Sequence, residues 1–250
     1  MRLSLDDAAW TSAWRTRSTL EKSLVCVGLL LVAATTTSLV VAGLVGVSAV
    51  GLATAARVPV RTWLGAMLGP AVFIAIGVVT IAVTLGPGEL VSWGPLGVDE
   101  GSASRASLVA ARALAATSAT VLLAATTPMV DLLAGLRRAR VPEVAVDIAA
   151  VTYRLIFSLL DAAAAISSAQ AGRLGYSGGR AARRSVGLLA ASVLVRAWER
   201  ARRLEEGLAG RGGVGAVPLV PARAVSAPFV LAGAALVLSL GALSLRAGLS

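Results

Sequence analysis

The stretch from Leu24 to Ala56, LVCVGLLLVAATTTSLVVAGLVGVSAVGLATAA, runs for 33 residues without a charged side chain. A transmembrane helix needs about 20 mostly apolar residues, each rising 1.5 Å, to cross a bilayer core of about 30 Å. The stretch is too long for one upright helix and short for two. It predicts either one span or a tight hairpin of two spans, and this choice sets the orientation of every element that follows.

The composition of the whole chain also indicates a membrane protein. Of its 250 residues, 57% are hydrophobic and 14% are charged, whereas a soluble domain carries about 25% charged residues. Three further apolar stretches are long enough to span a bilayer: Thr62 to Leu85, Ala106 to Met129 and Val225 to Leu245. The second of them holds one charged residue, Arg112, near one end.

The distribution of positive charge favours the hairpin. Four basic residues precede Leu24, fourteen arginines lie between 131 and 224, and none lies between 86 and 104. Because positive charge marks the cytoplasmic side, the N-terminus and the arginine-rich segment should share a side. That requires two crossings within the first stretch, with a turn near Thr37 to Gly43. The expected fold is all-α: a polytopic membrane protein with about five transmembrane helices, its N-terminus inside and its C-terminus outside.

A further apolar stretch, Val144 to Ile166, is predicted to lie at the membrane face rather than to cross. It carries three charged residues at a spacing of seven: Asp147, Arg154 and Asp161. Each charge costs about 2.5–3.5 kcal/mol at the centre of a span, while its ten Val, Leu, Ile and Phe residues return only about 3–6 kcal/mol in total. We therefore expect a membrane bundle over 1–130, a cytoplasmic insert over 131–222 and a closing transmembrane helix over 223–250.

Three helices are predicted in the cytoplasmic insert, over about 131–139, 142–171 and 181–209. Pro142 suits the first turn of the second helix, because its missing N–H would be unbonded there in any case. In the third helix, apolar residues recur at steps of three or four: Val186, Leu189, Val193, Ala197, Ala201, Leu204 and Leu208. Such a stripe predicts an amphipathic helix that packs against a partner surface.

Both long helices of the insert are predicted to end in glycine-flanked arginines, Arg173 and Arg211. The residues alone leave two interpretations open. The glycines are ordinary helix C-caps, and a cation near a helix C-terminus is favoured by about 0.3–1 kcal/mol. Alternatively, an arginine at a helix tip can reach a carboxylate on a partner and bind it through two parallel hydrogen bonds.

At these residues the chain resembles the transmembrane T component of energy-coupling factor (ECF) transporters, in particular the cobalt-type, CbiQ-like component. The resemblance covers most of the chain and rests on these segments: Arg17 to Lys22, Thr126 to Leu133, Leu136 to Pro142, Tyr153 to Phe157, Ala169 to Tyr176 and Glu199 to Gly212. The last two resemble the family's Ala-Arg-Gly-like motifs at the tips of its coupling helices. They depart from that pattern, with Gly172 and Gly210 where alanine is usual and Leu174 directly after the first arginine.

The resemblance implies a non-catalytic subunit of an ATP-driven importer in the bacterial inner membrane, with no cofactor of its own. The implied partners are two cytoplasmic ATPase subunits and a membrane substrate-capture (S) subunit that binds the metal. Arg173 and Arg211 would each insert into a groove on one ATPase. They would be flanked there by the tip glycines Gly172, Gly175, Gly210 and Gly212.

The residue inventory agrees with this division of labour. The chain has no histidine, one cysteine (Cys26) and one lysine (Lys22). It lacks the Gly-x-x-x-x-Gly-Lys-Ser/Thr phosphate loop of an ATPase, and it lacks the imidazole and thiolate groups typical of transition-metal sites. We therefore expect ATP hydrolysis and metal capture on other subunits, and no metal site in this chain.

Two other classes of function, a self-contained channel or carrier and a module that binds nucleic acid or acidic lipid, fit these residues less well. A self-contained channel or carrier needs ionisable groups inside its spans. Arg112 is the only candidate, and its position is explained if its side chain extends (snorkels) to the outer interface. A module for nucleic acid or acidic lipid would use the basic insert, but aromatic residues that stack on bases are not interleaved there, so no nucleic acid is expected. Within the T components, the Arg173-Leu174-Gly175-Tyr176 tip favours cobalt over nickel or a vitamin.

Overall fold

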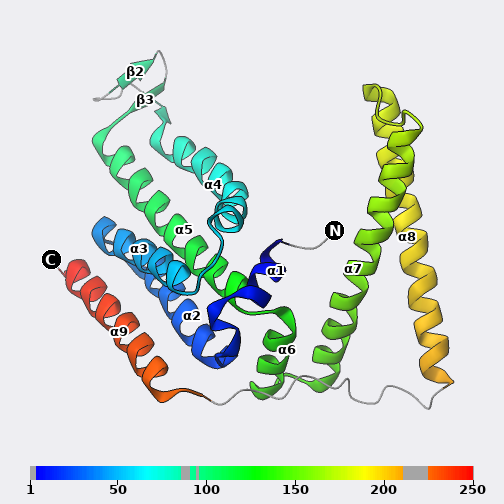
Figure 1. Ribbon diagram of the computed structural model, residues 1–250. Coiled ribbons are helices and arrows are strands. Elements are labelled where there is room, and N and C mark those ends of the chain that lie inside the picture. Colours follow the sequence, from blue (N-terminus) through cyan, green and yellow to red (C-terminus); the bar gives the residue numbers. More distant parts are fainter. Residues whose placement is uncertain (1–3, 86–90, 94–95, 211–224, 250) are drawn as a thin grey trace. The chain divides into compact units, whose positions relative to one another are not determined.

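The computed structural model describes residues 4–85, 91–93, 96–210 and 225–249 (Figure 1). The helices are α1 (Ser4–Thr11), the 3-10 helix η1 (Ala13–Thr16), α2 (Thr19–Thr35), α3 (Leu39–Ala55), α4 (Val60–Ala82), α5 (Glu100–Thr126), α6 (Met129–Arg138), α7 (Glu143–Gly172), α8 (Gly179–Ala209) and α9 (Ala227–Leu249). Three short antiparallel strands lie between α4 and α5, in the order β1 (Thr84–Leu85), β3 (Leu96–Val98), β2 (Val91–Trp93). The expected all-α class is confirmed, apart from this small sheet.

The described helices form two compact units. One unit contains α1 to α5 and α9 and is called the membrane bundle below. Helices α7 and α8 belong to the other unit and are called the coupling hairpin, after the role expected from the sequence. The boundary between the units falls after Leu132, within α6. The predicted division of the first apolar stretch into two helices is confirmed: α2 ends at Thr35 and α3 begins at Leu39. The turn lies at residues 36–38, at the start of the expected range of Thr37 to Gly43. That both helices cross the bilayer stays a prediction. The backbone N–H of Thr36 donates to the carbonyl of Val32 across 3.0 Å, which closes the last turn of α2.

Four described helices are long and apolar enough to cross a bilayer: α4, α5, α7 and α9. Helix α3 is apolar but shorter, and α2, of the same 17 residues, carries Glu21 and Lys22 in its first turn. No residue of α4 is buried, and Phe73 on its surface is 80% exposed, which suits a helix that faces lipid. The length and hydropathy of α7 alone do not distinguish a span from an interfacial helix, so its expected place at the membrane face stays a prediction.

Helix α5 is the centre of the membrane bundle, where it packs against α2, α3 and α4. Small residues make this close packing possible. Ala115 and Ala119 of α5 are fully buried in one cluster with Leu29 of α2 and Val45 of α3. Because helices in lipid associate through van der Waals packing rather than through a hydrophobic driving force, small residues at the contacts let the backbones approach.

Helices α2 and α9 pack closely, because a glycine on each helix lies opposite a valine on the other. A Cβ atom added at Gly28 of α2 would lie 2.8 Å from both Cγ atoms of Val237 on α9, and one added at Gly233 of α9 would collide with Val25 on α2. Each helix therefore offers a glycine to a valine of the other. Gly43 of α3, by contrast, faces open space.

Arg112 has protein partners rather than only the membrane interface. From α5, its Nε donates to the carbonyl of Ala33 across 3.3 Å, and its Nη2 donates to the carbonyl of Ala34. These carbonyls belong to the last turn of α2, where no further N–H of the helix can reach them. The guanidinium therefore caps α2 and joins it to α5, and its expected position at the outer membrane interface stays a prediction.

We predict that Gly28→Ala and Gly233→Ala each lower the thermal midpoint of the detergent-solubilised protein. The added methyl group overpacks the α2–α9 contact, which typically costs about 1–3 kcal/mol. The matched control is Gly43→Ala, which gains helix propensity of about 1 kcal/mol without a clash and should leave the midpoint unchanged or raised. Equal midpoints for Gly28→Ala and Gly43→Ala would contradict the packing described.

Candidate functional site

The turn between α7 and α8, which holds Arg173, closes α7 with a Schellman motif. The N–H of Gly175 donates to the carbonyl of Gln170 across 2.8 Å, and the N–H of Leu174 donates to that of Ala171 across 3.0 Å. These bonds satisfy carbonyls that the end of the helix leaves free. Leu174 has a φ of 59°, a left-handed conformation in which glycine is usual. Leucine is thus held in a strained position directly after the arginine.

The structure explains why residue 175, directly after Leu174, is a glycine. A Cβ atom at Gly175 would lie 2.7 Å from Oγ of Ser185 and 2.8 Å from the carbonyl oxygen of Gln170. Gly175 is needed for this close approach between the turn and α8. At Gly172, by contrast, an added Cβ meets nothing within 4 Å. An alanine would therefore fit at Gly172.

A set of polar contacts braces the turn from within. The Tyr176 hydroxyl donates to Oε1 of Gln170 across 2.8 Å, and Nε2 of Gln170 donates to the carbonyl of Ser185 across 3.0 Å. The Ser185 hydroxyl then donates to the carbonyl of Gly175 across 2.8 Å. Gln170, Gly175, Tyr176 and Ser185 are called the tip brace below. No role is assigned to Ser185 from the sequence, and no local pattern distinguishes it from Ser192 of the same helix.

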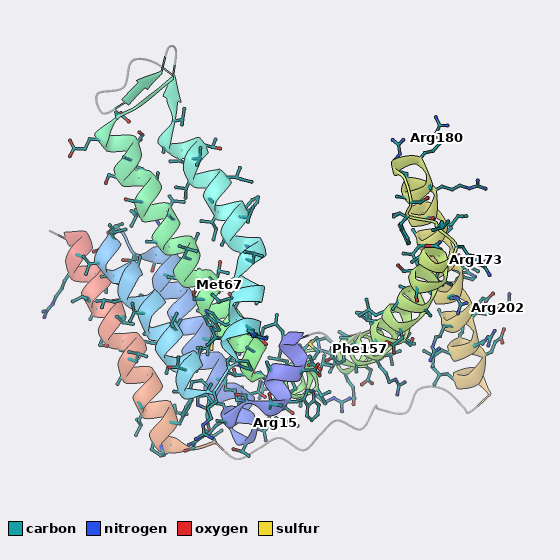
Figure 2. All side chains as sticks on the ribbon, turned by 45° about the horizontal axis from the view of Figure 1, so that its top comes forward. Arg15, Met67, Phe157, Arg173, Arg180 and Arg202 are labelled. Carbon is teal, nitrogen blue, oxygen red and sulfur yellow. The ribbon has the colours of Figure 1, made fainter. Side chains whose placement is uncertain are left out.

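Arg173 is exposed at the end of α7 (Figure 2). Its backbone is fixed, because its own N–H donates to the carbonyl of Gln170 across 3.1 Å. Its guanidinium makes no ion pair with any residue that the structure describes. The site is therefore a rigid turn that presents a cation with five N–H donors and no acceptor. Such a group can bind a carboxylate or a phosphate.

The second predicted tip is described only up to its first glycine. Gly210 follows α8, and its N–H donates to the carbonyl of Glu206 across 3.1 Å. A Cβ atom there would lie 3.5 Å from the Glu206 carbonyl oxygen, an ordinary contact. Arg211 and Gly212 lie outside the described residues. Helix α8 has 31 residues. With a rise of 1.5 Å per residue, it places Gly210 about 45 Å from the α7–α8 turn.

The amphipathic stripe predicted for α8 is confirmed in part. Leu189, Val193, Ala197, Leu204 and Leu208 are half-buried, whereas Val186 is 56% exposed and Ala201 is exposed. The hairpin has little core of its own: Val146 is the one buried residue described in α7, and Ser185 is the one in α8. The tip brace therefore contributes much of what fixes the turn.

Arg137 joins α6 to the beginning of α7. One of its terminal nitrogens, Nη2, lies 2.9 Å from Oδ1 of Asp147 and 2.8 Å from Oε1 of Glu143. Asp147 is one of the three charged residues spaced by seven in the sequence. It serves here as an interhelical ion-pair partner.

A second group of charges is buried at the base of the membrane bundle. Glu21 and Lys22 are 1% and 0% exposed, and Nζ of Lys22 donates to the carbonyl of Thr126 at the end of α5 across 2.9 Å. Nη1 of Arg15 lies 2.8 Å from Oδ2 of Asp131 (Figure 2). These five residues, Arg15, Glu21, Lys22, Thr126 and Asp131, are called the basal polar cluster.

The basal polar cluster brings together segments that are far apart in the sequence. The Thr19 hydroxyl donates to the carbonyl of Asp131 across 3.1 Å, and Oε1 of Glu21 accepts the backbone N–H of Ser226. The cluster thus connects the start of α2 to the end of α5, to the first turn of α6 and to the residue before α9. Buried charges are stable only when hydrogen bonds compensate their lost hydration, so these contacts strongly define the local geometry.

The comparisons with known proteins agree with these features. The family model described as cobalt transport protein, CbiQ, matches residues 11–220. The chain belongs to the CbiQ family of cobalt transport proteins. It is 39% identical to the cobalt transport protein CbiQ of Rhodobacter capsulatus over 246 residues, which cover 98% of this chain and 97% of that protein.

Two further relatives cover less. The chain is 34% identical to the cobalt transport protein CbiQ of Salmonella typhimurium over 151 residues, which are 56% of this chain and 67% of that protein. A relative from Methanocorpusculum labreanum is described as a fused cobalt transport protein, CbiMQ; it is 30% identical over 78% of this chain and 34% of its own length. The CbiQ family membership makes this chain a membrane component of cobalt transport. In the described parts of this CbiQ-family chain, no group of three His, Cys, Asp or Glu residues lies close enough to hold a metal ion.

We predict that Gly175→Ala disrupts the tip while Gly172→Ala does not. The Gly175 methyl group must displace Ser185 or the end of α7, at a cost of about 1–3 kcal/mol. The matched control is Gly172→Ala, three residues earlier, where the added methyl group meets nothing within 4 Å. Thermal midpoints of the purified proteins and cobalt uptake in cells measure the difference. Uptake that falls equally in both variants would contradict the steric reason given for Gly175.

Proposed function

We propose that this chain is the T subunit of an ECF-type ABC importer for cobalt ions. In this role it transmits ATP-driven motion from two cytoplasmic ATPase subunits to a membrane substrate-capture subunit. Membership in the CbiQ family supports the cobalt transport part of this proposal. The observation that supports the coupling part is the tip itself. Arg173 is exposed, makes no ion pair with a residue that the structure describes, and lies on a turn that hydrogen bonds hold in place.

In the proposed mechanism, Arg173 inserts into a groove on one ATPase and binds a carboxylate there through two parallel hydrogen bonds. Arg211 would do the same on the second ATPase. Helices α7 and α8 run in opposite directions, so their C-terminal ends lie at opposite ends of the coupling hairpin (Figure 1). Closure of the ATPase pair would then move both ends at once. Helices of 30 and 31 residues would carry that movement as rods.

The proposed domain organisation has a membrane bundle over 1–130, the coupling helices over 131–222 and a closing span over 223–250. We place the protein in the bacterial inner membrane, with the N-terminus and the coupling helices in the cytoplasm. The fourteen arginines between 131 and 224 support this orientation. The basal polar cluster would hold the first turn of α6 to the bundle, through the contact of Arg15 with Asp131.

The substrate site is proposed to lie on another polypeptide. The chain has no histidine and one cysteine, whereas sites for cobalt use imidazole, thiolate or carboxylate ligands. The relative described as a fused CbiMQ protein is about three times as long as its matched segment. The fusion suggests that a CbiM-type partner supplies the metal-binding capture subunit, and ATP hydrolysis is proposed for separate ATPase subunits.

We predict that Arg173→Glu combined with Arg211→Glu abolishes both ATPase copurification and cobalt uptake. Each substitution replaces an attraction to a partner carboxylate with a repulsion. Arg180→Glu is the matched control, because Arg180 is also exposed and lies in the first turn of α8; it should keep at least half of the uptake. A double variant that still binds two ATPase subunits and imports cobalt would refute the coupling role of the tips.

The orientation has its own test, which uses single-cysteine variants in a Cys26→Ser background. Ser177→Cys, in the exposed α7–α8 turn, should resist a membrane-impermeant maleimide in intact cells and react in inside-out vesicles. Ser104→Cys, exposed near the start of α5, should show the opposite pattern. Labelling of Ser177→Cys from outside intact cells would overturn the proposed topology, whatever the ATPase experiment shows.

A further inference from the structure

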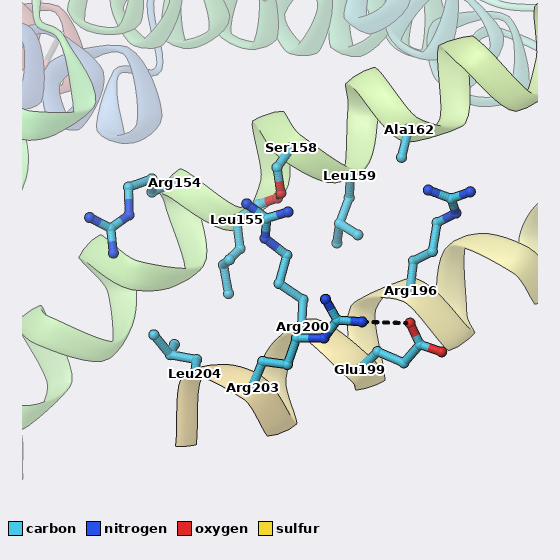
Figure 3. A pocket seen from close by; sticks show the side chains of 10 residues that line it. All are labelled: Arg154, Leu155, Ser158, Leu159, Ala162, Arg196, Glu199, Arg200, Arg203 and Leu204. Carbon is cyan, nitrogen blue, oxygen red and sulfur yellow. Dashed lines mark hydrogen bonds and ion pairs between the residues drawn. The ribbon is translucent and has the colours of Figure 1, made fainter. Parts of the chain in front are cut away.

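A groove with a volume of about 620 Å³ lies between α7 and α8, away from the tip (Figure 3). Four of its lining side chains are arginines: Arg154 from α7 and Arg196, Arg200 and Arg203 from α8. Figure 3 shows the side chain of Arg200 extending from α8 toward Ser158 of α7. The floor between them is apolar and is formed by leucines of both helices. These four arginines and their floor are called the basic groove.

The charges in the basic groove are poorly compensated. Glu199 is the one acidic residue that lines it, and its Oε2 lies 3.8 Å from Nη2 of Arg203. Both side chains are more than half exposed, and such pairs contribute little. Arg196 and Arg200 are four residues apart, and like charges at this spacing destabilise a helix by about 0.2–0.5 kcal/mol. Three positive charges therefore remain in one groove without a described counter-ion.

The arginines of the groove keep contact with water. Val193, Ala197 and Leu204 of the same turns of α8 are half-buried, whereas Arg196 and Arg200 are exposed. Both arginines nevertheless line the groove beside α7, so their charges lie around one space that a solute can enter. An anion in the groove would supply the counter-charge that these guanidinium groups lack.

We propose that the basic groove binds a phosphate-bearing anion, either the head group of an acidic phospholipid or a soluble phosphate compound. A phosphate has several charged oxygens and can accept paired hydrogen bonds from more than one guanidinium. A carboxylate, with two oxygens, fills the fork of one arginine. The bound anion joins α7 to α8 at mid-length and replaces the missing core of the coupling hairpin.

This site is separate from the α7–α8 tip. Arg196 and Arg200 lie more than twenty residues beyond Arg173 in the sequence, and none of the tip brace lines the groove. The inference rests on the charge and shape of the groove, and its test measures anion binding by this chain alone, without ATPase subunits.

The test uses the purified full-length chain in a zwitterionic detergent, titrated separately with short-chain phosphatidylglycerol, short-chain phosphatidylcholine and inorganic phosphate. The readouts are the thermal midpoint and the ligand retained in native mass spectrometry. Phosphatidylcholine should have no effect, whereas phosphatidylglycerol, inorganic phosphate or both should raise the midpoint. Arg196→Gln with Arg200→Gln should weaken that binding at least about tenfold, because both substitutions remove charged hydrogen bonds to the anion.

The matched control is Arg183→Gln with Arg184→Gln, which removes the same charge from exposed positions of the same helix outside the groove. It should weaken binding less than about threefold. If the groove variant fails to fold, Arg196→Lys with Arg200→Lys keeps the charge, loses the paired hydrogen bonds and should still weaken binding. Selective retention of phosphatidylglycerol identifies a lipid, and equal binding of inorganic phosphate identifies a soluble compound. Binding of neither, or an equal loss in the control, overturns the proposal.

Discussion

Free backbone groups at helix ends are the constraint on which the rest of this structure depends. Helices that cross a bilayer satisfy their own interior hydrogen bonds, but the last carbonyls and the first N–H groups need other partners. Here long polar side chains from distant helices supply several of them. Arg112 bonds to the end of α2, Lys22 to the end of α5, and the carboxylate of Glu21 to the residue before α9. Each contact caps one helix and fixes its distance from another.

The loop between α4 and α5 follows the same principle. Asp99 caps α5 by accepting the N–H of Ser102, and the Ser102 hydroxyl donates to the carbonyl of Ala82 at the end of α4 across 2.9 Å. The hydrogen bonds from Ser102 hold the pKa of the Asp99 carboxyl below its ordinary value. This cap is therefore complete above the ordinary carboxyl pKa and is lost only as the pH falls through the lowered value. Two neighbouring helices of the bundle are thus fastened at a shared end.

In the coupling hairpin, too, hydrogen bonds from another helix or turn satisfy the backbone groups at a helix end. Its tip brace satisfies the carbonyls at the end of α7 and at the same time holds the turn against α8. Because the two helices bury little apolar surface, rigidity at the tip comes from directional hydrogen bonds. A rigid tip suits the proposed coupling role, since an arginine on a flexible loop would absorb the movement of a bound partner. Farther along, the basic groove leaves room for an anion to complete the contact between the same two helices.

The sequence by itself determined the helical class, the hairpin of α2 and α3, the bounds of the insert helices to within two or three residues, and Arg173 as a helix-end cation. These features depend on local patterns: runs of apolar residues, glycines at helix ends and the count of arginines on each side. Only the tertiary structure decided which glycines carry packing, since Gly28 and Gly233 meet valines and Gly43 meets nothing. It also decided that Lys22 is buried and that Arg200 faces α7. Hydropathy indicates how much free energy it costs to bury a side chain. The hydrogen-bond partner that offsets this cost lies on a distant segment of the chain, and only folding brings the side chain and its partner together.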